Sequence, residues 1–124
     1  MSGGDFTERQ LVFVYGTLKD GYCNNSVLGR ADGVKVQDSQ VRPGEFTMVD
    51  LGAFPALIED KNGGRIFGEI WEVDSLKPLD RLEGYPTLYD RKRIETDTGQ
   101  VCWIYFMQDW RCRGERIIES GEWA

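Results

Sequence analysis

The residue best suited to chemistry is Glu83, a carboxylate at the C-terminal end of a predicted helix. Leu76, Leu79 and Glu83 stand at helical spacing, so the face that buries two leucines also carries this carboxyl group. Burial, the negative end of the helix dipole and the neighbouring Asp80 would all disfavour its charged form. We therefore expect a raised pKa at Glu83, which suits a general base. The alternative is an exposed glutamate in the last helical turn.

The chain of 124 residues contains no histidine, which excludes Ser-His-Asp triads and Cys-His dyads. An acid–base enzyme would then need a carboxylate, thiol, lysine or tyrosine with a perturbed pKa. The three cysteines form no CxxC pair, which argues against a zinc site, and their odd number favours a reducing, cytoplasmic location (Cys23, Cys102 and Cys112). We therefore expect no zinc site.

A second carboxylate, Glu69, competes with Glu83 for a chemical role. It falls in a predicted strand over residues 65–73, on the face that carries Phe67, Trp71 and Val73. A carboxylate among large apolar side chains must be either hydrogen-bonded for structural reasons or kept for catalysis. Both interpretations stay open, and we favour the structural one.

The stretch over residues 11–18 is the candidate binding element. Residues 11–15 are apolar or aromatic, which predicts a strand buried on both faces. The strand ends abruptly at Gly16 and Thr17, where backbone N–H groups and a hydroxyl become available to hold a carboxylate or another small anion. An ordinary glycine turn is the alternative.

The remaining pattern predicts one α+β domain made mostly of short strands. A flexible tail is expected over residues 1–10 and the domain over residues 11–124. Residues 62–64 give the strongest hairpin-like turn signal, and residues 97–100 give a second one. The expected strands cover residues 11–15, 33–41, 46–49, 65–73, 89–96 and 101–106, with helices over residues 24–29 and 75–83.

The charge and hydropathy of the chain narrow the class of partner. A net charge of −6 and a pI near 4.7, without a basic run, argue against nucleic acid. No apolar run is long enough to cross a membrane, and residues 1–9 lack the hydrophobic block of a signal peptide. We expect a small-molecule ligand, and the sequence leaves the oligomeric state open.

Three stretches together resemble the γ-glutamyl cyclotransferase-like superfamily. They are Val-Phe-Val-Tyr-Gly-Thr-Leu-Lys at residues 12–19, Gly-Glu-Ile-Trp-Glu-Val-Asp at 68–74, and Leu-Asp-Arg-Leu-Glu-Gly-Tyr at 79–85 followed by Tyr-Asp-Arg at 89–91. The ending Glu-Ser-Gly-Glu-Trp at 119–123 is also similar to small bacterial members. The opening motif, extended through residues 20–21, most resembles the γ-glutamylamine cyclotransferase branch.

The resemblance implies a fold, a site and a reaction. The fold would be a small, mostly antiparallel β-barrel with short flanking helices. Tyr15, Gly16, Thr17 and Leu18 would grip a γ-glutamyl group, and Glu83 would be the catalytic glutamate. The implied reaction is attack of the substrate's α-amine on its own γ-carbonyl, which releases 5-oxoproline and a free amine without a metal or a cofactor.

Two features leave the substrate open. Residues 22–25 lack the proline often found there in the γ-glutamylamine branch, and the chain is shorter than the branches acting on glutathione or γ-glutamyl amino acids. The first hypothesis is an enzyme acting on γ-glutamylamines such as γ-glutamyl-ε-lysine. The alternative is a binding protein that uses the same pocket without turnover.

Overall fold

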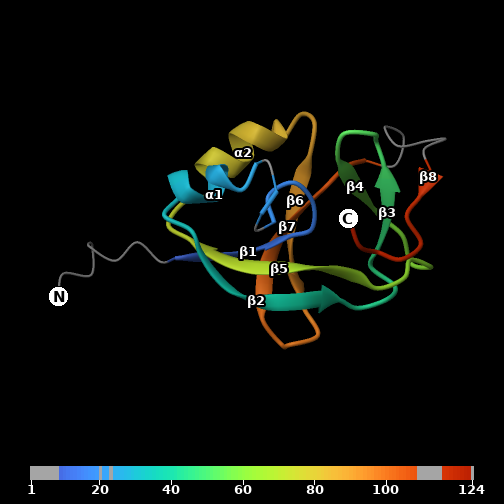
Figure 1. The fold of residues 1–124 in the computed structure, drawn as a ribbon. Helices are drawn as coiled ribbons and strands as arrows, with labels where there is room; N and C mark the ends of the chain where they lie inside the picture. Colours follow the sequence, from blue (N-terminus) through green and yellow to red (C-terminus); the bar gives the residue numbers. More distant parts are fainter. Residues whose placement is uncertain (1–8, 20, 23, 109–115, 124) are drawn as a thin grey trace.

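The computed structural model describes residues 9–19, 21–22, 24–108 and 116–123, which form two β-sheets and two short helices (Figure 1). The larger sheet has the strand order β2-β5-β1-β7-β6, and the smaller one β4-β3-β8. Every pairing is antiparallel except the parallel contact of β1 with β7. The elements are β1 (Gln10–Val14), α1 (Ser26–Arg30), β2 (Val34–Val41), β3 (Phe46–Asp50), β4 (Pro55–Glu59), β5 (Ile66–Val73), α2 (Lys77–Glu83), β6 (Asp90–Glu95), β7 (Val101–Phe106) and β8 (Arg116–Ile117).

This architecture confirms the α+β class with mostly antiparallel strands, whereas closure of the strands into a barrel stays a prediction. Strand β1 begins at Gln10, where the sequence predicted the last residue of a tail. The side chain of Arg9, also part of the expected tail, is bound to β5, because its Nε donates to Glu72 Oε1 at 2.8 Å. Residues 1–8 of the expected tail lie outside the described residues. None of the helices described is both long and apolar enough to span a membrane.

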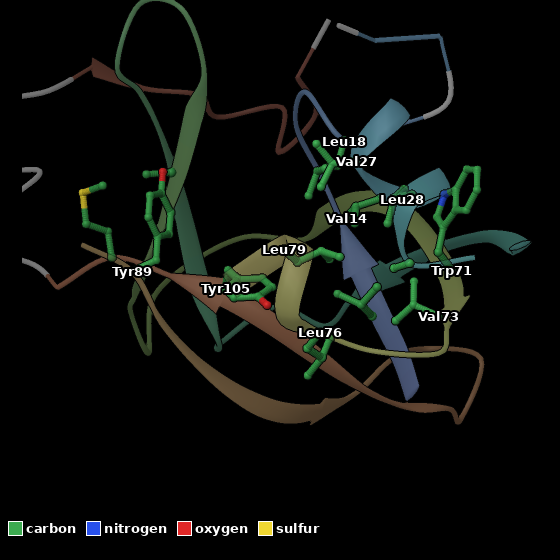
Figure 2. Close-up of a cluster of buried hydrophobic side chains, with 14 of the residues drawn as sticks. Val14, Leu18, Val27, Leu28, Trp71, Val73, Leu76, Leu79, Tyr89 and Tyr105 are labelled. Carbon is green, nitrogen blue, oxygen red and sulfur yellow. The ribbon is translucent and has the colours of Figure 1, made fainter. Parts of the chain in front are cut away.

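Two apolar clusters share the residues of β1, as expected for a strand buried on both faces. Val12 and Val14 pack in one cluster with side chains from the two helices, including Leu28 and Leu79 (Figure 2). Phe13 and Tyr15 alternate into the other cluster, which contains residues of the smaller sheet. β1 therefore has a buried cluster on each face, and the loop that follows it begins in the core.

Helix α2 begins two residues later than the sequence predicted and ends where it was expected. Leu76 is the N-cap residue and makes no side-chain capping bond, but the Lys77 N–H donates to Ser75 Oγ at 3.1 Å. Gly84 ends the helix with φ 66°, a left-handed conformation that glycine adopts without strain. Glu83 thus occupies the last helical position, as predicted.

The chain turns near the predicted residues 62–64, but the turn does not make a hairpin, because β4 and β5 on either side belong to different sheets. A Cβ atom on Gly63 would lie 1.9 Å from the Phe46 carbonyl oxygen. Gly63 closes a turn through its N–H, which donates to the Asp60 carbonyl oxygen at 3.0 Å, and a glycine is needed there for the close approach to Phe46. The hairpins join β3 to β4 and β6 to β7, and the latter turn lies at the predicted residues.

Candidate active site

The end of α2 and the loop that follows β1 line one cavity of about 320 Å³. Glu83 and all four residues of the predicted binding loop line it, although the helix and the loop are far apart in the sequence. Its wall also includes residues that the sequence did not single out. The lining residues are Phe13, Val14, Tyr15, Gly16, Thr17, Leu18, Asn24, Ala53, Phe54, Pro55, Leu82, Glu83, Leu88, Tyr89 and Tyr105.

The loop after β1 is fixed by hydrogen bonds from the residues that follow it. The Asn24 N–H donates to the Thr17 carbonyl oxygen at 2.9 Å, and Asn24 Nδ2 donates to Thr17 Oγ1 at 2.8 Å. Asn25 Nδ2 donates to the Leu18 carbonyl oxygen at 2.9 Å. In the described part of the chain, no group accepts a hydrogen bond from the N–H of Gly16, Thr17 or Leu18. Three successive backbone donors are thus available at one cavity, which suits an anionic or carbonyl oxygen.

Gly16 and Tyr15 explain how the loop approaches the opposite wall. A Cβ atom on Gly16 would lie 2.8 Å from Pro55 Cγ, so a larger residue would push the two walls apart. The Tyr15 hydroxyl is buried and donates to the Tyr105 carbonyl oxygen at 2.8 Å. Tyr15 therefore anchors the loop to β7, and its ring forms part of the cavity wall.

Burial raises the pKa of Glu83 to about 7. Glu83 is half-buried at the end of α2. Among the described residues, none forms a hydrogen bond or an ion pair with its carboxyl group. The sequence also predicted repulsion from Asp80, but that carboxylate pairs with Arg91, whose Nε lies 3.0 Å from Asp80 Oδ1. Burial alone therefore accounts for the shift. A group with a pKa near 7 can both accept and donate a proton at neutral pH.

Tyr105 is a part of the site that sequence analysis missed. Its hydroxyl donates to Asp80 Oδ1 at 2.6 Å, and burial together with this bond raises the pKa of the phenol. The Arg91 guanidinium, which lies over the rings of Tyr85 and Trp103, binds the same carboxylate. The available signal was a phenol in an otherwise apolar strand, since a buried tyrosine hydroxyl needs a partner.

Glu69 does not reach this cavity. Its Oε1 accepts a hydrogen bond from Trp71 Nε1 at 3.0 Å, and its Oε2 lies 3.5 Å from Lys35 Nζ. It lines a separate cavity of about 410 Å³ together with Lys19. The structural interpretation of Glu69 is thereby favoured. In the described parts of the chain, no three His, Cys, Asp or Glu side chains come together as a metal site would need.

Comparison with known proteins identifies the family of the chain. The model of the family described as "Gamma-glutamyl cyclotransferase, AIG2-like" matches residues 12–124. The chain belongs to this family. The resemblance seen in the sequence motifs is thus confirmed, and with it the expectation of an enzyme of the γ-glutamylcyclotransferase type.

Individual relatives agree with this membership. A Vibrio cholerae protein provisionally named a gamma-glutamylcyclotransferase is 38% identical over 118 residues, with 94% of this chain and 96% of that protein covered. The gamma-glutamylaminecyclotransferase of Bos taurus is 35% identical over 107 residues, which cover 76% of this chain and 63% of the bovine protein.

Solved structures support the fold. A uropathogenic E. coli protein, c4763, superposes with a TM-score of 0.78 at 23% identity and covers 93% of this chain and 92% of its own. An AIG2-like protein from Mus musculus gives a TM-score of 0.72 at 26% identity, with 81% and 78% covered.

Proposed function

We propose that the chain is a γ-glutamylamine cyclotransferase that releases 5-oxoproline and a free amine. The observation that carries the proposal is the meeting of Glu83 with the loop of Tyr15, Gly16, Thr17 and Leu18 at one cavity. The loop would bind the γ-glutamyl group through its backbone donors, and Glu83 would be the catalytic residue. Similarity to the bovine gamma-glutamylaminecyclotransferase supports the choice of substrate class.

In this mechanism Glu83 first accepts a proton from the α-ammonium group of the substrate. The freed amine attacks the γ-carbonyl carbon and closes a five-membered ring, while the carbonyl oxygen takes up the negative charge. Backbone N–H groups of residues 16–18 are suited to stabilise that oxygen. Collapse of the intermediate breaks the bond to the leaving nitrogen. Two protons move in total from the α-nitrogen to the leaving nitrogen, and Glu83 alternates as their acceptor and donor.

The burial of Glu83 favours this enzyme over the alternative of a binding protein without turnover. A carboxyl group that lacks a described partner and has a pKa near 7 costs stability at neutral pH, and a binding site has no need of it. Because the reacting atoms belong to one molecule, the site has only to hold the substrate in a folded conformation and move protons.

The test is 5-oxoproline release from a panel of γ-glutamyl compounds, measured by chromatography. We expect the wild-type protein to turn over γ-glutamylamines and the Glu83→Gln variant to be at least about a hundredfold slower, because general-base catalysis is worth about 10²–10⁴-fold. Substrate binding should survive this substitution, and thermal melting controls for folding. Tight binding of a panel member by a wild-type protein that releases nothing would make the protein a binder.

A further inference from the structure

The part of the Glu83 cavity that faces solvent is apolar. Of the residues that line the cavity, those that are exposed are Ala53, Leu82 and Leu88. The two leucines keep 40% and 41% of their surface accessible, and Phe54, which lines the same cavity, is half-buried. Apolar side chains at the mouth of a cavity are suited to contact the apolar part of a ligand bound there.

The exposed rim formed by Ala53, Leu82 and Leu88 offers no partner for a charged substituent. Glu83 is the single carboxylate of the described cavity lining, which contains neither lysine nor arginine. The hydroxyl of Tyr105 donates to Asp80, and that of Tyr89 lies 3.4 Å from the Pro55 carbonyl oxygen. An ammonium or carboxylate seated against the apolar side chains of this rim would lose part of its hydration without gaining a partner, which is costly.

The position of this rim, which Ala53, Leu82 and Leu88 form, indicates which half of a substrate it would contact. If Glu83 delivers a proton to the leaving nitrogen, that nitrogen must lie at the end of α2. Leu82 precedes Glu83, and the Leu88 N–H donates to the Gly84 carbonyl oxygen at 2.7 Å, which holds Leu88 against the same helix end. The substituent on the leaving nitrogen would therefore lie against these two leucines.

We infer that the leaving group is a primary amine whose substituent is apolar and carries no further charge, seated against Leu82, Leu88 and Phe54. The inference rests on the proposed function and narrows its substrate class. Each methylene group that the amine buries on this rim should raise kcat/KM about fourfold. Amines that carry an additional carboxylate or ammonium, including lysine released from γ-glutamyl-ε-lysine, should be poor leaving groups here.

Two matched pairs of substrates test the inference. The γ-glutamyl conjugates of isoamylamine and leucine differ by one carboxylate, and those of hexylamine and 1,5-diaminopentane differ by a terminal ammonium in place of a methyl group. We expect kcat/KM for the uncharged member of each pair to exceed that of the charged member by at least about tenfold. Equal or better turnover of the charged members would overturn the inference.

Variants of the rim test whether the leucines cause this preference. Leu82→Ala and Leu88→Ala should each lower kcat/KM for the hexylamine conjugate at least about fourfold relative to the methylamine conjugate. Val101→Ala is the matched control, because Val101 is an exposed apolar residue outside the cavity, and it should leave this ratio unchanged. A ratio that none of the three substitutions changes would also overturn the inference.

Binding measurements separate this inference from the proposed function. If no conjugate releases 5-oxoproline, the proposed function fails, and calorimetric dissociation constants for the same two pairs decide the inference. Tighter binding of the uncharged members would support it, and equal or weaker binding would overturn it. If charged and uncharged conjugates are both turned over equally well, the proposed function stands and this inference alone fails.

Discussion

Glu83 and Glu69 are both half-buried glutamates, and each lines its own cavity. They differ in what surrounds the carboxyl group. Glu69 accepts a hydrogen bond from the Trp71 indole and lies 3.5 Å from the Lys35 ammonium. Glu83 has no such partner among the described residues, and burial raises its pKa to about 7. Partial burial alone therefore does not make a carboxylate suited to proton transfer; burial without compensation does.

The two cavities also differ in the polarity of their linings. The cavity at Glu83 is lined mainly by apolar and aromatic side chains together with the free N–H groups of the loop after β1. The cavity at Glu69 is lined by several charged and hydroxyl side chains, among them Lys19, Asp38 and Asp97. Electrostatic interactions are stronger where fewer polar groups and less water compete, so the first cavity is the better place for charge to develop and be stabilised.

Matched substitutions of the two glutamates should give the largest contrast. Glu83→Gln should lower the turnover of γ-glutamylamines at least about a hundredfold, whereas Glu69→Gln should change it less than about threefold. Glutamine keeps the shape of each side chain, and only at Glu83 is the ability to take a proton expected to matter. The measurement is 5-oxoproline release by both variants under identical conditions. Comparable losses in the two variants would contradict the division of roles proposed here.

The parts of this molecule that the sequence predicted depend on local pattern. The alternation of β1, the stop at Gly84 and the placement of Glu83 beside two buried leucines follow from neighbouring residues. The signal at residues 62–64 predicted the turn but not its kind, because a glycine pair fits both a hairpin turn and a turn that closely approaches another strand. Only the tertiary contact with Phe46 decides between the two.

The rest of the candidate site could not be predicted because it depends on contacts between distant segments. Nothing local to Asp80 indicates that Arg91 and Tyr105 bind its carboxylate, and this pairing removed a source of repulsion that the sequence predicted for Glu83. Nor does the spacing of Leu82 and Leu88 show that both border one cavity. Which of the two glutamates lacks a partner is likewise a tertiary property.

The second contrast between Glu83 and Glu69 is the pH dependence of the free energy of unfolding. Between about pH 4.5 and pH 7 the unfolded chain has lost the Glu83 proton while the folded chain retains it, so raising the pH favours unfolding. This group should therefore lower the free energy of unfolding by about 3 kcal/mol over that range, with no further change above it. Urea denaturation from pH 5 to pH 8 measures the slope, which Glu83→Gln should remove.

The control for this prediction is Glu69→Gln, in which the slope due to Glu83 should persist. The lowered pKa values of Asp50 and Asp60 do not interfere, because their hydrogen bonds stabilise the fold throughout this range and are lost only at lower pH. A wild-type slope that Glu83→Gln leaves intact would show that the carboxyl group is not buried as the structure describes.

The smallest expected contrast concerns the hydroxyl groups at the two cavities. Tyr105→Phe keeps the aromatic wall of the Glu83 cavity but removes the 2.6 Å hydrogen bond to Asp80, and it should cost about 1–2 kcal/mol of stability. Because Asp80 stands one turn before Glu83, the loss should also lower kcat, by less than about tenfold.

Ser39→Ala is the matched substitution at the other cavity. It removes a 3.0 Å contact with Thr98, which keeps further partners. It should cost less than about 1 kcal/mol and leave kcat unchanged. Thermal melting and 5-oxoproline release measure both effects, and a drop in kcat for Ser39→Ala as large as that for Tyr105→Phe would show that the second cavity also serves turnover.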